Sequence, residues 1–176
     1  MKLTTKGRYA VMAMADLALF KGKGPTSLTD ISLRQNISLA YLEQIFIKLK
    51  NKNLVKSIRG AKGGYVLEIS PEDIKISNII SAVDEEVKML NCKKNSKRGC
   101  NNKLSKCITH DLWDQLDQHI NIFFEKVKML NCKKESKKGC NSKSTKCITH
   151  NLWDQLDQHI NNFFEKIKLQ DLVKKN

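Results

Sequence analysis

The hydrophobic residues in the first part of the chain recur at helical spacing. Between about Lys6 and Phe20 they form one apolar face, made of Tyr9, Met12, Ala13, Leu17 and Phe20. Gly22, Gly24 and Pro25 then interrupt the pattern. We therefore predict an amphipathic helix that ends in a turn.

Two further helices are predicted on either side of a tight turn. The first spans about residues 29–35, with Ser27 or Thr29 as its N-cap, and the second starts after Ser38 and ends near Asn51. The second helix has one stripe of buried positions, namely Leu42, Ile45, Phe46 and Leu49. Its opposite side carries small and polar residues with two flanking side chains: Ala40, Glu43, Gln44, Ile47, Tyr41 and Lys48. This arrangement is typical of a helix-turn-helix DNA reader, although an ordinary helical hairpin has the same pattern.

A β-hairpin is predicted directly after the reader helix. Residues 54–59 and 65–69 alternate between apolar and polar, and residues 60–64 form a glycine-rich tip. Arg59 and Lys62 lie at this tip, where glycines such as Gly60 let the backbone approach a phosphate or a minor groove closely. A hairpin in this position is a wing, and the pattern favours duplex DNA over simple solvent exposure of the two cations.

The helical pattern returns after Pro71. A short helix is expected over residues 77–84, and a longer one begins near His110, with a face made of Trp113, Leu116, Ile120, Phe123 and Val127. Little other protein is available to cover that face. We therefore expect the longer helix to pack on a partner, most simply the same helix of a second subunit.

The longer helix belongs to a block that occurs twice. Residues 87–126 and 127–166 are identical at 33 of 40 positions, without a gap. Each block begins with a polar loop that has almost nothing apolar to bury, and each then continues as the helix. His119 and His159 also repeat, on the helix and away from the loop, where packing or surface roles are expected for them.

All six cysteines lie in the two loops. Each block has the spacing Cys-x7-Cys-x6-Cys-x2-His, ending at His110 and at His150. Three cysteines cannot pair completely within one block, which disfavours disulfides against reduced thiolates. Three thiolates and one imidazole make a complete ligand set for zinc or for an iron–sulfur cluster, and redox-active thiols without metal are a third possibility.

Charge and length add further bounds. The net charge is +14, with +4 in residues 1–86 and +10 in residues 87–176, so the excess lies near the cysteine loops, where solvated lysines account for most of it.

The short apolar run at the N-terminus is interrupted by Asp16 and lacks a cleavage region, which predicts a cytoplasmic protein without a signal peptide or membrane span. With no glycine-rich nucleotide loop and no nucleophile–base set, the chain is predicted not to be an enzyme.

Several stretches resemble a known family. They are LTTKGRYAVMAMADLAL, ISLAYLEQIFIKLKNKNLVKSIRGAKGGYVL and ISAVDE, followed by the three cysteines, CITHDLWDQL and the terminal LQDLV. On these motifs the chain resembles the IscR-type iron–sulfur cluster regulators, which are winged-helix bacterial repressors. The resemblance covers the chain apart from the extra block. The cysteine spacers are somewhat longer than the family pattern, and the duplication is not a family feature.

The resemblance implies a mainly α fold with a small β-wing. We expect a winged helix-turn-helix DNA-binding domain in residues 1–86, a first cysteine loop and long dimerisation helix in 87–126, and a second loop, helix and tail in 127–176. It also implies a homodimer that binds operator DNA and carries a [2Fe–2S] cluster received from the iron–sulfur assembly machinery. Control of cluster-assembly genes would follow from cluster occupancy.

Site residues follow from the same match. The ligands would be Cys92, Cys100, Cys107 and His110, and the second block repeats them as Cys132, Cys140, Cys147 and His150, so one or two clusters per subunit are expected. We favour the first loop, because its position relative to the wing is that of the family. The base-reading face would include Ser38, Ala40, Tyr41 and Gln44, and the wing would contribute Arg59, Gly60 and Lys62. Glu43 occupies the position of a glutamate that disfavours one operator class until cluster binding masks or moves it.

Two other functions stay open. One is a nitric-oxide or iron sensor of the same fold with a different cluster. The other is a metal or cluster carrier in which DNA binding is secondary, a reading that the second complete ligand set supports.

Overall fold

The computed structural model of the chain describes residues 5–84, 109–128 and 148–168. The described elements are, in order, α1 (Thr5–Leu19), α2 (Leu28–Gln35), α3 (Leu39–Asn51), β1 (Val55–Ile58), β2 (Gly64–Leu67), α4 (Ile76–Ala82), α5 (His110–Lys126) and α6 (His150–Glu165). This order confirms the mainly helical fold with one hairpin, and the predicted bounds agree within two residues. Among these helices none is long and apolar enough to cross a membrane.

Local hydrogen bonds explain why α2 and α3 begin where they do. The hydroxyl of Ser27 accepts from the backbone N–H of Asp30 at 3.1 Å, and that of Ser38 accepts from the N–H of Tyr41 at 3.2 Å. Asn36 ends α2 in the left-handed conformation, with φ 56°, which asparagine tolerates better than most residues. The helix-turn-helix is therefore specified by residues within a few positions of each boundary.

Helix α1 is more deeply buried than predicted. The sequence indicated one apolar face, but its buried residues surround most of the helix: Gly7, Ala10, Val11, Ala13, Met14, Ala15, Asp16 and Leu17. The prediction of a single face was wrong because α1 packs against four elements, namely α2, α3, α4 and β2. Tyr9 and Met12, assigned to the apolar face, are only half-buried.

The two strands form an antiparallel hairpin that is tied to the start of α2. Val55 pairs with Leu67 and Ile58 with Gly64. Thr26 and Tyr65 add a bridge of two backbone hydrogen bonds, of 3.0 and 2.8 Å. A Cβ atom on Gly64 would lie 2.5 Å from the carbonyl oxygen of Thr26, so only glycine allows this close approach.

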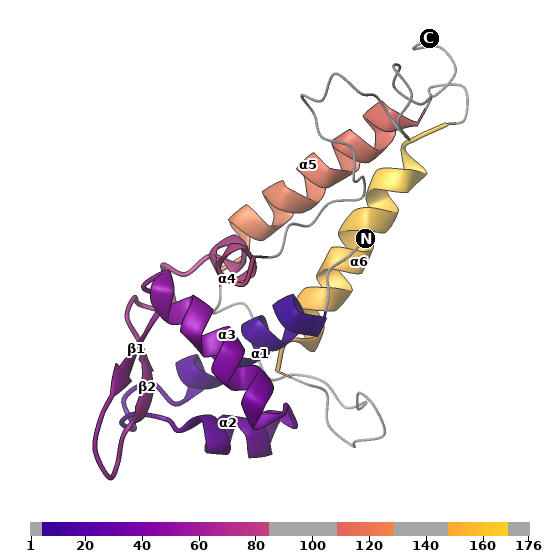
Figure 1. Cartoon of the computed structure of the whole chain (residues 1–176). Helices are drawn as coiled ribbons and strands as arrows, with labels where there is room; N and C mark the ends of the chain where they lie inside the picture. Colours follow the sequence, from indigo (N-terminus) through magenta and orange to yellow (C-terminus); the bar gives the residue numbers. More distant parts are fainter. Residues whose placement is uncertain (1–4, 85–108, 129–147, 169–176) are drawn as a thin grey trace.

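Helices α5 and α6 lie side by side and project together from the rest of the protein (Figure 1). At its C-terminal end α5 contacts α4, where the backbone N–H of Ile76 donates to the carbonyl oxygen of Val127 at 3.1 Å. The predicted face of α5 is buried at Leu116, Ile120 and Val127. The surface that was expected to meet a second subunit meets α6 of the same chain.

Candidate functional sites

The outward face of α3 has the composition expected of a DNA reader. Ala40, Glu43, Gln44 and Ile47 are exposed, whereas the predicted stripe of Leu42, Ile45, Phe46 and Leu49 is buried. Amide and carboxylate groups can bond to base edges, and an aliphatic side chain can contact a thymine methyl group. The sequence pattern therefore placed the two sides of this helix correctly.

Two residues predicted for base reading make structural contacts. The Ser38 hydroxyl accepts the capping bond at the start of α3. The ring of Tyr41 is half-buried and packs edge-on against that of Tyr9, with 5.7 Å between centroids. Ser38 thus caps α3 and Tyr41 packs it on α1, so Ala40, Glu43 and Gln44 are the stronger candidates for DNA contact.

The wing is held rigidly against the reader helix. Phe46 of α3 packs against Tyr65 of β2 with ring centroids 4.8 Å apart, and Lys50 of α3 donates to the Ser57 hydroxyl of β1 at 2.9 Å. The tip carries Arg59 and Lys62, both exposed. These contacts fix the position of the two tip cations relative to the outward face of α3.

The backbone at the wing tip depends on glycine. Gly60 has φ +126°, a conformation that side chains rarely adopt, and nothing lies within 4 Å of where its Cβ would be. Arg59 and Lys62 lie on either side of Gly60. They therefore belong to an open turn that can approach a phosphate backbone. Electrostatic contacts of this kind position a protein on DNA without reading sequence.

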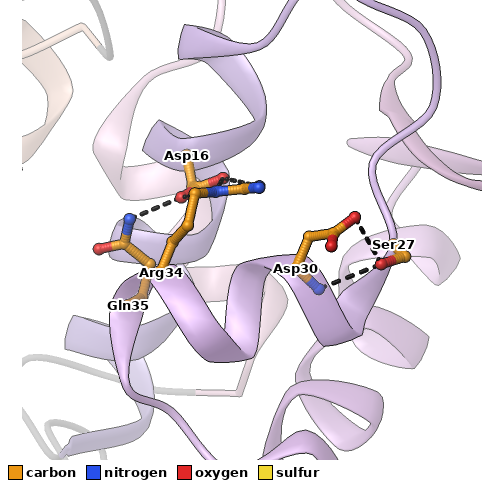
Figure 2. A network of polar contacts seen from close by, with 5 residues as sticks. All are labelled: Asp16, Ser27, Asp30, Arg34 and Gln35. Atoms are coloured by element: carbon orange, nitrogen blue, oxygen red, sulfur yellow. Dashed lines mark hydrogen bonds and ion pairs between the residues drawn. The ribbon is translucent and has the colours of Figure 1, made fainter.

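A buried carboxylate joins α1 to α2, as Figure 2 shows. Asp16 is 1% exposed and accepts from the Arg34 guanidinium at 2.6 Å and from the Gln35 amide at 2.6 Å. The guanidinium also stacks on Phe20, with 4.1 Å from its carbon to the ring centroid. The hydrogen bond to Asp16 raises the pKa of Arg34 above its ordinary value.

This network was missed in the sequence, where Asp16 was only an interruption of an apolar run. Its partners are 18 and 19 positions away, beyond any local pattern. A buried charge is tolerated only when it is paired and hydrogen-bonded, so Asp16 fixes the C-terminal end of α2 on α1. Because the turn into α3 follows at once, this buried contact also constrains where α3 begins.

A second link connects α3 to the end of α4. Lys48 forms an ion pair with Asp84, the last described residue before position 109. The hydrogen bond from Lys48 lowers the pKa of Asp84 below its ordinary value. The reader helix is thus in contact with the point where the chain enters the first cysteine loop.

Most candidate metal ligands lie outside the described residues. This holds for all six cysteines, Cys92, Cys100, Cys107, Cys132, Cys140 and Cys147, and leaves two histidines. His110 is the first residue of α5 and is buried; His150 is the first residue of α6, is half-buried and lies 3.2 Å from the Asp154 carboxylate. Within the described ranges no three potential ligands come together.

The two histidines lie at opposite ends of the helix pair. Trp113 near the start of α5 contacts Phe164 near the end of α6, so the helices run antiparallel. The start of α6 is beside α1, where Arg8 lies over the ring of Trp153 at 5.6 Å. His150 is therefore at the end of the pair next to the DNA-binding domain, and His110 is at the far end (Figure 1).

A helix-turn-helix with a wing packed on its reader helix is the architecture of DNA-binding transcriptional regulators. The chain belongs to the Rrf2 family, described as iron-dependent transcriptional regulators, whose model matches residues 3–130. The match ends close to the boundary between the two blocks. The second block thus lies almost wholly beyond it.

Similar proteins agree with this class. The HTH-type transcriptional regulator IscR of Aliivibrio salmonicida is 51% identical over 123 residues, which cover 70% of this chain and 71% of the relative. The protein of the same name from Pectobacterium carotovorum is 49% identical over 70% of this chain and 73% of the relative.

Similar solved structures are also transcriptional regulators. The structure of T. potens IscR has a TM-score of 0.60 at 35% identity and covers 74% of this chain and 85% of its own. CymR, the global cysteine regulator of B. subtilis, has a TM-score of 0.62 at 33% identity and covers 74% of this chain and 95% of its own. The prediction of a winged-helix regulator is confirmed at this level.

Proposed function

We propose that this regulator senses iron–sulfur cluster supply and controls cluster-assembly genes through operator DNA. The observation that carries the proposal is the exposed polar face of α3 beside a fixed cationic wing, in a chain whose sequence contains complete Cys3His sets. IscR is the name of several relatives, and the family description is iron-dependent. Because its proposed partner is operator DNA, the proposed location is the cytoplasm.

The donor chemistry fits an iron–sulfur cluster. In the first block the holders would be Cys92, Cys100, Cys107 and His110, and in the second Cys132, Cys140, Cys147 and His150. Replacing one thiolate by imidazole makes a [2Fe–2S] centre less negative and raises its potential. When bound, the cluster would supply a signal that reports the capacity of the assembly machinery, its proposed donor.

Metal analysis of the full chain tests this directly. We expect anaerobic preparations to contain iron and sulfide with a visible cluster spectrum, and we would compare the parent with Cys92→Ala and Cys132→Ala. If iron is lost only in Cys92→Ala, the chain holds one cluster, in the first block. If each variant loses half of the iron, the chain holds two clusters, one in each block. Zinc in place of iron after anaerobic preparation would exclude cluster sensing.

Glu43 is the proposed determinant of operator choice. Its carboxylate is on the exposed face of α3, where a negative group opposite a base acceptor costs affinity. Cluster binding would mask or move it and so admit a second class of operator. We expect Glu43→Ala to bind both classes whether or not the cluster is present, measured by anaerobic DNA titration at fixed salt. If the operator preference of the Glu43→Ala variant still depends on the cluster as it does in the parent, Glu43 does not have this role.

Cluster transfer distinguishes the regulator from a carrier. A carrier should donate its cluster to apo-acceptors, whereas a regulator should show cluster-dependent operator binding. The homodimer implied by the resemblance would need the face of α5 that α6 covers in this chain.

A further inference from the structure

The contacts between α5 and α6 repeat themselves under the 40-residue offset. Trp113 packs on Phe164 with ring centroids 6.2 Å apart, and the equivalent residues Trp153 and Phe124 lie 6.5 Å apart. Each pair joins the start of one helix to the end of the other. A contact made by residue i with residue j is therefore also made by the copy of j with the copy of i.

The middle of the pair follows the same rule. His119 lies 5.0 Å from Phe163, and its equivalent His159 lies 5.3 Å from Phe123, between ring centroids. His119 and His159 are copies of one position and face each other at 5.7 Å. A position that meets its own copy marks the axis of a two-fold arrangement.

This is the geometry of a symmetric dimer interface. In a two-fold homodimer the same patch is used on both subunits, so residue i contacts j and j contacts i. Here the two patches are two copies of one block in a single chain. The centre of the interface is buried on both helices, at Leu116 and Ile120 of α5 and at Leu156 of α6.

Departures from the symmetry show what is missing. Phe124 is 2% exposed because the end of α5 also packs on α4, whereas its copy Phe164 is 38% exposed. Within the described residues, the second helix of the pair packs on no DNA-binding domain at the corresponding end. These residues therefore contain both helices of a two-fold pair and one DNA-binding domain.

Since both helices present almost the same inward residues, the helix-to-helix contacts that α5 makes with α6 are those that a second copy of α5 could make. Covalent linkage gives α6 a high effective concentration at α5, and a free second copy lacks this advantage. The balance between identical contacts then favours the linked helix.

We infer that α6 replaces a second subunit at the pairing face of α5, so that the full chain is a monomer with an internal copy of a dimer interface. The occupant of this face is the second block of the same chain. The inference concerns assembly and holds whether or not either block carries a cluster.

The test combines a coupling measurement with a mass measurement, on the full chain under anaerobic, reducing conditions at one fixed pH. One double-mutant cycle uses His119→Ala with Phe163→Leu, and the matched cycle uses His159→Ala with Phe123→Leu. Both are measured by urea unfolding at about 1 µM and about 100 µM, since dilution weakens only contacts between chains. Light scattering gives the mass at both concentrations.

We expect each cycle to show a coupling of about two- to tenfold in the unfolding equilibrium constant, as for other aromatic pairs. The coupling should be similar in the two cycles and unchanged by dilution, with the mass of one chain, 20.1 kDa, throughout. A coupling lost on dilution, the absence of coupling in both cycles, or the mass of two chains would overturn the inference. The cycles change only histidine and phenylalanine, so failure of the proposed cluster function leaves the result interpretable.

Discussion

Helices α5 and α6 have nearly the same sequence and different surroundings. Helix α5 is buried toward its C-terminal end, at Ile120 and Phe124, where it meets α4. Helix α6 is buried near its N-terminal end at Leu152, and the neighbouring Trp153 lies under Arg8 of α1. Because the helices are antiparallel, these two segments lie at the end of the pair that joins the DNA-binding domain, whereas His110 and Phe163 are buried toward the other end.

The comparison separates the secondary structure, which the local sequence encodes, from the burial of each residue, which depends on where the helix lies in the fold. Identical residues form the same element in both blocks, as their local interactions require. Their burial differs because, among the described residues, the DNA-binding domain packs against only one end of the pair, through α4 and α1. Four changes test this difference, in order of decreasing expected effect.

Removal of residues 127–166 should have the largest effect. It leaves one block and the same Lys–Ile junction, because Lys126 then precedes Ile167 as Lys166 does in the parent. The face of α5 would lose its cover, and we expect it to pair with a second copy, giving the mass of two chains by sedimentation equilibrium.

The matched control is removal of residues 87–126, which yields a chain that differs at seven positions from the first deletion. Both deletions should associate alike. Single-chain mass in both would mean that α5 has no tendency to form a symmetric pair.

Phe124→Ala and Phe164→Ala test the burial difference within nearly identical local sequence, since Ile122 is replaced by Asn162 and Val127 by Ile167. We expect Phe124→Ala to lower the free energy of unfolding by about 3–5 kcal/mol, the usual cost for a buried phenylalanine. Phe164→Ala should cost less than about 1.5 kcal/mol, because that ring is already partly in water. Urea unfolding at one protein concentration measures both, and equal losses would contradict the difference in packing.

Arg8→Ala tests the contact between α1 and α6. The guanidinium lies over Trp153, and an exposed cation–π contact is worth about 0.5–1 kcal/mol. We expect a loss of that size in thermal unfolding, with partial recovery in Arg8→Lys, which keeps the charge. The same loss in a variant that already lacks the Trp153 ring would show that the effect has another source.

The smallest effect concerns the ion pair between α4 and α5. Lys75 donates to Glu125 at 2.7 Å, and this hydrogen bond lowers the pKa of Glu125 below its ordinary value. A depressed carboxyl pKa stabilises the fold above the unfolded pKa, and this contribution is lost as the pH falls through the folded pKa.

Glu125→Gln should therefore lower stability slightly at neutral pH, and the difference from the parent should vanish in acid. Glu165→Gln is the matched variant, since among the described residues Glu165 has no ion pair. We expect this substitution to leave the free energy of unfolding unchanged at both pH values. A pH-independent loss for Glu125→Gln would point to packing instead of charge. Stability against pH at low salt is the measurement, because salt screens exposed pairs.

Much of the DNA-binding domain could be predicted because its signals are local. Ser27 and Ser38 cap α2 and α3 with bonds to residues three positions away, and the two sides of α3 follow its helical period. The wing followed from alternation around glycines. The depth of α1 and the pairing of Asp16 with Arg34 could not be predicted, because both depend on residues far apart in the sequence.

The sequence by itself determined the elements, the outward face of α3, the duplication and the repeated cysteine–histidine pattern, because each is a pattern of neighbouring residues or of a fixed offset. Only the tertiary structure decided which surface covers α5. Two copies of one block contain the same pairing residues, so their sequence is equally compatible with pairing inside a chain and between chains. Chain connectivity and the single α4 beneath the pair break that equivalence, and they place His150 rather than His110 next to the DNA-binding domain.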